Sequence, residues 1–419
     1  MLKKIKFEAP FMNNKYSKLK AACYSANISM SIVSSLSPVL FLIFRTLYGI
    51  SYSKLGLLVL ISFITQLGVD LIFSFFSHKF NIPTTLKINP LLTIIGLIIY
   101  SLSPWIFKDN VYIGLVIGTF IFSAASGLNE VLISPTIASI PSKDPDREMS
   151  KLHSVFAWGV VAIIIFSTVF LLLFGQKSWQ ILSMIFIIVP LISFILFSTS
   201  EIPEMETPKK VSGALALLKN KGVWACVAAI FLGGASECTM SQWSSSYLEQ
   251  ALGIPKIWGD IFGVAMFSVM LGLGRTLYAK IGKNINKIII SGFIGCVICY
   301  LAAAISNIAI IGLIACAFTG FCASMLWPGN LIIASDRFPA GGVFIYALMA
   351  AGGDLGASVG PQLVGIVTDL AIKNPKAIAL ASTLELAPEQ LGMKLGLLVG
   401  MLFPLAAFLL FGHLKAKNK

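Results

Sequence analysis

The chain has 419 residues, of which 57% are hydrophobic and only 12% are charged, and its formal net charge is +13. A water-soluble protein has about 25% charged residues, so this composition excludes a soluble globular protein and predicts an all-α membrane protein. The positive charge is spread over loops between apolar segments, so we expect a lipid bilayer as partner and no nucleic acid.

Residues 1–20 are polar and basic and lack the apolar core of a cleavable signal peptide, which predicts a cytoplasmic tail. Twelve apolar segments follow, each long enough to supply the roughly 20 residues that cross a bilayer. The predicted spans lie near residues 21–44, 53–77, 86–107, 110–139, 150–174, 178–198, 222–248, 258–281, 286–305, 308–335, 342–371 and 391–413.

Basic residues predict the orientation, because Lys and Arg are enriched in cytoplasmic loops. With both termini in the cytoplasm, 22 of the 31 basic residues fall inside, eight fall outside, and Arg275 lies within a span. Trp105, Trp179 and Trp258 then lie at outer helix ends, where an interfacial belt is expected. We therefore expect a multi-pass protein of the plasma (inner) membrane, and a monomer.

The longest polar cytoplasmic segment, residues 199–221, predicts a linker between two six-helix bundles at 21–198 and 222–413, with a second tail at 414–419. The bundles repeat at an offset of about 204, since "LYGISYSKLG" followed by "QLGVD" returns as "ALGIPKIWGD" followed by "MLGLG". Twelve helices in two pseudo-symmetric halves are therefore expected, with a central site between the halves.

Ionisable residues at membrane depth are costly and are often functional. Glu130 lies in the fourth predicted span, next to Asn129, and shares a helical face with Ser126 and Ser134. This polar stripe predicts a cavity-facing site in which Glu130 carries a proton and Asn129 contacts solute, because a partly desolvated carboxyl can exchange protons near neutral pH. A structural hydrogen bond to a neighbouring helix is the alternative.

The seventh predicted span contains Glu237, a second proton-coupling candidate, followed by Gln242 and Trp243. An amide beside an indole suits sugar binding, because the amide binds hydroxyl groups while the ring covers an apolar sugar face. On an ideal helix these two residues project away from Glu237, so they reach the same cavity only if the helix breaks. Packing or an outer-interface position is the alternative for Trp243.

Two later spans add candidate solute contacts. Trp327 and Asn330 flank a Pro-Gly pair that would distort the helix, and they predict a binding wall or a gating kink. Asp354 lies among small residues that permit close helix packing. It is either a packed, paired carboxylate or a solute contact.

Charges toward the cytoplasmic helix ends predict gating. Asp70 would form a salt bridge with a basic residue such as Arg147 or Arg275, and Arg337 is a further candidate gating charge. His153, whose imidazole titrates near neutrality, would relay protons or pair with Glu130. An ordinary interfacial histidine is the alternative.

The layout resembles the major facilitator superfamily. The loop "DLIFSFFSHKFN" keeps only Lys79 of the superfamily signature between helices two and three, whereas "GLGRTLYAKIGK" keeps Gly274 and Arg275 in the second half. The resemblance implies that Lys79 and Arg275 help to close the cytoplasmic face.

Within the superfamily, "GLNEVLISP" resembles the fucose–galactose–glucose:proton symporter group, with Glu130 five residues before Pro135. Ser134 stands where that group has asparagine, and Pro38 lies near the position of its helix-one carboxylate. The resemblance implies a sugar:proton symporter that works by alternating access.

No P-loop, metalloprotease or nucleophile motif is found in the sequence, so an ion gradient is the expected energy source and no enzyme, cofactor or metal site is predicted. The seven cysteines lie in apolar stretches and predict no disulfides. Two alternatives stay open, a proton-coupled drug or metabolite exporter and a non-transporting membrane sensor.

Overall fold

The computed structural model describes residues 16–76, 80–142, 145–203, 218–281, 284–338 and 342–416. Across these ranges the secondary structure is helical, without a β-strand. Twelve helical segments are long and apolar enough to cross a membrane, which confirms the predicted number of spans and the all-α fold.

The first half contains six spans. They are α2 (Ser17–Tyr48), α3 (Tyr52–Phe76), α4 (Ile82–Ile106), α5 (Val111–Ser139), α6 (Pro145–Phe174), and α7 (Trp179–Ile185) with α8 (Ile188–Ser198). A short 3-10 turn, η2 (Gln176–Ser178), precedes α7.

The second half also contains six spans, two of which are built from consecutive pieces. They are α10 (Lys221–Leu252), α11 (Lys256–Trp258) with the π-helix η3 (Gly259–Ala265) and α12 (Met266–Ile281), α13 (Ile285–Ile305), α14 (Ala309–Ala323) with α15 (Leu326–Arg337), α16 (Gly342–Lys373), and α18 (Pro388–Ala416). The short helix α17 (Pro375–Thr383) connects the last two spans.

Equivalent glycines end the first helix of each half. Gly49 follows α2 with φ 63°, and Gly253 follows α10 with φ 66°, a left-handed conformation that glycine adopts without steric cost. The two positions are 253 − 49 = 204 residues apart, which equals the offset of the sequence repeat. The repeat therefore has a structural counterpart in how these helices end.

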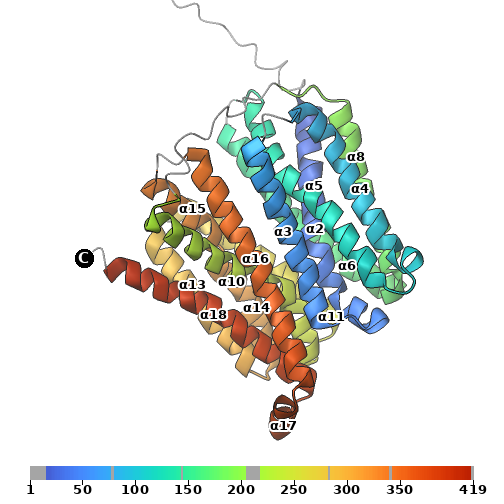
Figure 1. Ribbon diagram of the computed structural model, residues 1–419, viewed down its shortest axis with the longest axis vertical. Helices are drawn as coiled ribbons and strands as arrows, with labels where there is room; N and C mark the ends of the chain where they lie inside the picture. The colour runs from blue at the N-terminus through green and yellow to red at the C-terminus, as the bar shows by residue number, and fades with distance from the viewer. Residues whose placement is uncertain are drawn as a thin grey trace, which may run out of the picture.

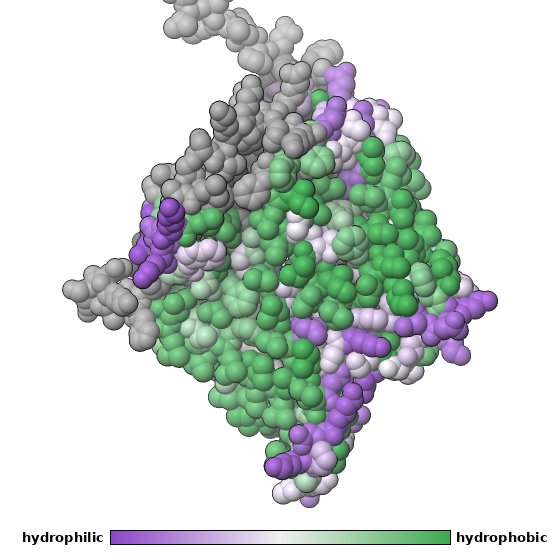
Figure 2. All heavy atoms as spheres, in the orientation of Figure 1, coloured by the Kyte–Doolittle hydropathy of each residue, from purple (hydrophilic) through white to green (hydrophobic). Residues whose placement is uncertain are grey.

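The two halves lie side by side and meet along α3 and α16, which are antiparallel neighbours (Figure 1). We call the side where α2 begins the N-terminal face and the side where α2 ends the distal face. Hydrophobic side chains cover the flank of the molecule over both halves, whereas polar side chains gather toward its ends (Figure 2). This distribution suits a protein that is surrounded by lipid.

One of the three tryptophans expected in an interfacial belt lies elsewhere. Trp105 and Trp258 are 58% and 48% exposed, but Trp179 is fully buried. Its ring packs edge-on against Phe44 and Tyr100, and its Nε1 donates a hydrogen bond to the Tyr48 hydroxyl at 3.1 Å. The belt prediction for Trp179 is wrong because α7 turns this face into the helix bundle. All seven cysteines are free thiols in the structure.

Candidate functional site

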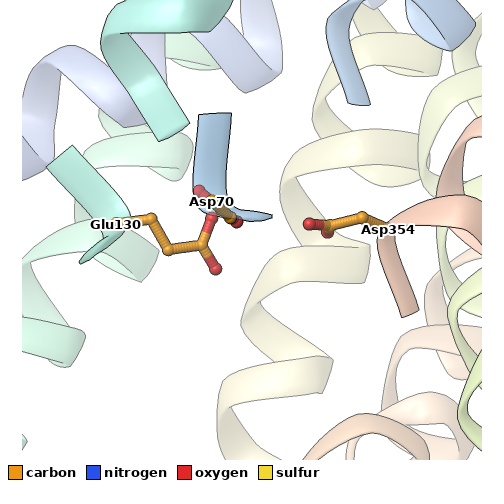
Figure 3. A group of neighbouring side chains, drawn as sticks. All are labelled: Asp70, Glu130 and Asp354. Atoms are coloured by element: carbon orange, nitrogen blue, oxygen red, sulfur yellow. The ribbon is translucent and has the colours of Figure 1, made fainter. Parts of the chain in front are cut away.

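Three carboxylates from both halves come together at the α3–α16 junction. Asp70 lies on α3, Glu130 on α5 and Asp354 on α16, and one oxygen from each lies within 4.8 Å of the other two (Figure 3). Asp70 and Asp354 are buried, whereas Glu130 is exposed. We call this group the carboxylate triad.

Close helix packing brings the triad together. A Cβ atom on Gly127 of α5 would lie only 3.0 Å from the Cα of Gln66 and 3.2 Å from Oδ1 of Asp70, so glycine lets α3 approach α5 one turn before Glu130. On α16, a Cβ on Gly356 would overlap the backbone of Phe231 in α10. These glycines hold α5 and α16 in the positions from which their carboxylates meet.

The triad is electrostatically unbalanced. No described residue donates a hydrogen bond to Oδ1 of Asp70 or Oδ2 of Asp354, and both atoms are buried. Three carboxylates this close cannot all be ionised in a low-dielectric environment unless a proton or cation neutralises part of the charge. The triad is therefore the part of the described structure best suited to exchange a positive charge.

Asp70 was expected to form a salt bridge with Arg147 or Arg275. The prediction is wrong for Arg275. Arg275 instead lies 3.6 Å from Glu237, and its Nε donates to the Ser324 carbonyl at 3.1 Å. The reason is that α12 packs mainly against α14 of the second half. The side chain of Arg147 lies outside the described residues.

Glu237 and Arg275, predicted as a proton carrier and a gating charge, thus form one pair. The Glu237 side chain is 14% exposed and that of Arg275 is 44% exposed. The second carboxylate oxygen of Glu237 is buried and has no described hydrogen-bond partner. The pair keeps a free acceptor on Glu237, so it remains a candidate contact for a polar solute.

Trp243 lies in the core rather than at a cavity, and this part of the prediction is wrong. The helix α10 runs without a break from Lys221 to Leu252. Trp243 is fully buried, its Nε1 donates to the Pro361 carbonyl at 2.8 Å, and its ring contacts Phe41 across the junction of the halves. Its role here is to join the two halves.

Gln242 also reaches across the junction. It is 8% exposed, and its Nε2 lies 3.5 Å from the Ser34 carbonyl on α2. This contact is at the long limit for a hydrogen bond, so the amide can change partner at low cost. Gln242 therefore remains a candidate solute contact in a more open arrangement.

The two predicted asparagines have structural partners. Asn129 accepts a hydrogen bond from Asn89 at 2.8 Å, which directs its amide toward α4. Asn330 donates to the Leu326 carbonyl at 2.6 Å and is 2% exposed. Both amides are buried and satisfied locally, so the prediction that they line a solute cavity is wrong for this arrangement of the helices.

Trp327 is half-buried and packs against α16. A Cβ on Gly353 would lie 2.5 Å from Cη2 of this ring, which places the indole beside the residue that precedes Asp354.

Arg337 is exposed and lies over the Phe338 ring at 5.9 Å. Lys79 and the side chain of His153 lie outside the described residues.

A cavity of about 630 Å³ opens between α2 and α6, in the part of both helices near the N-terminal face. Apolar and aromatic side chains form most of its wall, and Trp158 is 69% exposed. Its lining residues are Tyr24, Ile28, Lys151, Ser154, Val155, Trp158, Gly159, Ala162 and Ile163. No role was predicted for these residues, because an apolar helix face gives no distinct sequence signal.

Asp369 of the second half caps a helix of the first half. Its two carboxylate oxygens accept hydrogen bonds from the backbone N–H groups of Tyr52 at 3.1 Å and Ser53 at 2.7 Å. These are the first residues of α3, whose amide groups have no partner within their own helix. Asp369 is 7% exposed, so the cap is shielded from water.

A second polar cluster joins the halves on the distal side. Asp260, in the π-helix η3, forms a buried ion pair with Lys256 at 2.8 Å and accepts a hydrogen bond from Ser245. Thr168 of α6, in the other half, also donates to Asp260 at 3.0 Å. The halves are thus in contact near the distal face, whereas the α2–α6 cavity lies nearer the N-terminal face.

Comparison with known proteins agrees with this architecture. The family model described as Major Facilitator Superfamily matches residues 22–361. No curated protein sequence matches the chain.

Three solved structures show the same fold at low sequence identity. A nucleoside transporter, NupG (D323A mutant), has a TM-score of 0.73 and 12% identity, covering 94% of this chain and 99% of its own. A D-xylose–proton symporter has a TM-score of 0.70 and 15% sequence identity, and the match covers 93% of this chain and 97% of that one. The E. coli fucose:proton symporter FucP (N162A) has a TM-score of 0.57 and 14% sequence identity, and the match covers 94% of this chain and 99% of that one.

Proposed function

The chain belongs to the major facilitator superfamily, and from that premise we propose that it carries a small polar solute by alternating access, coupled to protons at the carboxylate triad. The protein is an integral membrane transporter and not an enzyme. The meeting of Asp70, Glu130 and Asp354 between the two halves is the observation that carries the coupling proposal.

Coupling follows from where the triad lies. Transporters of this architecture work largely by rocking one half against the other, and Asp354 belongs to the opposite half from Asp70 and Glu130. Bringing α3 and α16 together forces like charges into one site, which favours proton uptake there. Separating the helices removes that repulsion and favours release of the proton.

A sugar is the first solute to test. The Glu130–Pro135 motif resembles the fucose–galactose–glucose group, and two similar structures are named as a xylose and a fucose symporter. Glu237 with its free oxygen, Arg275 and Gln242 supply donors and acceptors for hydroxyl groups. The excess of basic residues in the loops supports a cytoplasmic position for the N-terminal face.

Export of a lipophilic cation is the second candidate. The α2–α6 cavity has apolar walls with an exposed indole from Trp158, and the triad supplies excess negative charge. An apolar wall and an aromatic face suit a hydrophobic cation. In transport assays, such a substrate would move in the direction opposite to the protons, whereas a symported sugar would move in the same direction.

Uptake into proteoliposomes with an imposed pH gradient tests the proposal. The wild-type protein should accumulate a monosaccharide in the presence of the gradient, and Glu130→Gln should reduce pH-driven accumulation at least tenfold while exchange of preloaded solute persists. Asp109→Asn, an exposed carboxylate in the loop before α5, is the matched control. Undiminished accumulation by Glu130→Gln would show that Glu130 is not the coupling group.

A further inference from the structure

We propose that the carboxylate triad also binds a small, hard inorganic cation, which competes with protons for Asp70, Glu130 and Asp354. This inference rests on the proposed function, in which the triad is the coupling site, and it names a second occupant for that site. Each of the three residues offers one oxygen, and the three oxygens lie within 4.8 Å of one another.

Two of these residues have a buried oxygen without a partner. Asp70 is 9% exposed and Asp354 is 5% exposed, and neither Oδ1 of Asp70 nor Oδ2 of Asp354 accepts a hydrogen bond from the described part of the chain. The Asp354 carboxylate points from α16 toward the other two carboxylates (Figure 3). An unsatisfied buried polar group destabilises the fold, and more so when it is charged, so a positive charge between the three carboxylates would supply the missing partner.

A metal ion and a proton differ in how many carboxylates they can contact at once. A proton held between a carboxyl and a carboxylate makes a hydrogen bond about 2.5–2.7 Å long. A shared proton of this kind joins two oxygens, whereas the triad brings together one oxygen from each of three carboxylates. A proton can occupy one carboxyl at a time here, but it cannot bridge all three.

Hard cations bind oxygen ligands at characteristic distances. Ca²⁺ binds oxygen at about 2.3–2.6 Å, so oxygens on opposite sides of it are roughly 4.6–5.2 Å apart. Mg²⁺ binds at about 2.0–2.1 Å and would draw them to roughly 4.0–4.2 Å. The three oxygens lie within 4.8 Å of one another, so all of them can contact one hard cation at these distances.

The surroundings favour entry and retention of a cation. Glu130 is exposed, so an ion can reach the buried pair through it. The guanidinium of Arg275 is held by Glu237 instead and leaves the triad without a described basic partner. Because Asp354 comes from the second half, a bound ion would stabilise the arrangement in which α3 and α16 are together.

Terbium luminescence tests the site on the purified full-length protein, since Tb³⁺ substitutes for Ca²⁺ and is sensitised by a nearby indole. Trp327 packs beside Gly353, next to Asp354, so excitation of tryptophan should produce Tb³⁺ emission that Ca²⁺ or Na⁺ displaces. Asp354→Asn and Asp70→Asn should each weaken Tb³⁺ binding at least tenfold, whereas Asp109→Asn should not. Trp327→Phe should reduce the emission while calorimetric Ca²⁺ affinity stays within twofold.

The outcomes separate the two proposals. Emission that persists in both Asp70→Asn and Asp354→Asn, or that neither Ca²⁺ nor Na⁺ displaces, would overturn the cation site even if uptake remains pH-driven and dependent on Glu130. Cation binding that depends on the triad, combined with pH-driven uptake that Glu130→Gln does not change, would support the site and overturn proton coupling. If one asparagine variant fails to fold, the other gives the same comparison.

Discussion

Glu148 ties the first and fifth spans together at the N-terminal face. Its carboxylate lies 3.0 Å from Nζ of Lys20 and 3.2 Å from Nζ of Lys151, and the Tyr24 hydroxyl approaches it at 3.4 Å. The hydrogen bonds from Lys20 and Lys151 hold the pKa of Glu148 below its usual range. The contribution of this cluster is modest, because ion pairs near the surface stabilise proteins by about 0–1 kcal/mol.

A depressed pKa sets the sign of the pH dependence. The stabilisation by Glu148 should be complete above the usual glutamate pKa and should be lost as the pH falls through the lowered one. We therefore expect Glu148→Gln to reduce the free energy of unfolding by up to about 1 kcal/mol at neutral pH, and by less in acid. Thermal unfolding of the two proteins, followed from neutral pH down to a pH below the lowered pKa of Glu148, measures this, and an equal difference at every pH would contradict it.

Other single residues were partly predictable. Glu130 and Asp354 were identified in the sequence because a carboxyl within an apolar segment is costly wherever it lies. Their meeting with Asp70 was not predictable, since it depends on the register of α3 against α16, which are far apart in the sequence. Asn129 and Trp243 were misassigned because residue type does not determine which face of a helix meets a cavity.

Among the helices, α3 depends on its partner half for its N-terminal cap. Asp369 accepts from the first two amides of α3, and no sequence pattern marked it because its partners are backbone groups. A helix cap is worth about 0.5–2 kcal/mol. Because this cap joins the two halves, its energy contributes to keeping the distal face closed.

Asp369→Ala should shift the protein toward a state open at the distal face. A cysteine at position 55, which is buried one turn into α3, would report the opening through its reaction with a membrane-impermeant maleimide. A loss of about 1.4 kcal/mol corresponds to a tenfold faster reaction, and Asp369→Asn should have a smaller effect because it keeps one acceptor. Unchanged labelling of the Asp369→Ala protein, relative to the Leu55→Cys protein alone, would exclude a role for the cap in closure.

At the scale of the whole molecule, the twelve spans followed from hydropathy and the repeat followed from matching loops. The relative placement of the halves could not be predicted from the sequence, because it depends on contacts between distant segments, such as that of Thr168 with Asp260. Hydrophobic segments predict that helices cross the membrane. They do not predict which helices pack together, because an apolar side chain is equally well accommodated by lipid and by a neighbouring helix. The sequence therefore predicted the number of membrane-spanning helices, but not which helices pack against one another.

Covalent closure of the distal face should stop turnover. Thr168→Cys combined with Asp260→Cys replaces a 3.0 Å contact between the halves, so mild oxidation should form a disulfide. Transport should fall at least tenfold on oxidation and recover on reduction, because alternating access requires the halves to separate there. Each single-cysteine variant under the same treatment is the control, and full transport by the cross-linked protein would refute the requirement for distal opening.

The cap on α3 has a consequence for mutational tolerance. Its donors are the main-chain amides of Tyr52 and Ser53, which every residue except proline retains. Substitutions at positions 52 and 53 would preserve this link between the halves, whereas almost any replacement of Asp369 would remove it. Among related transporters, position 53 should accordingly vary more freely than position 369. Position 52 is constrained for a different reason, since the Tyr52 side chain is fully buried and packs against Trp243.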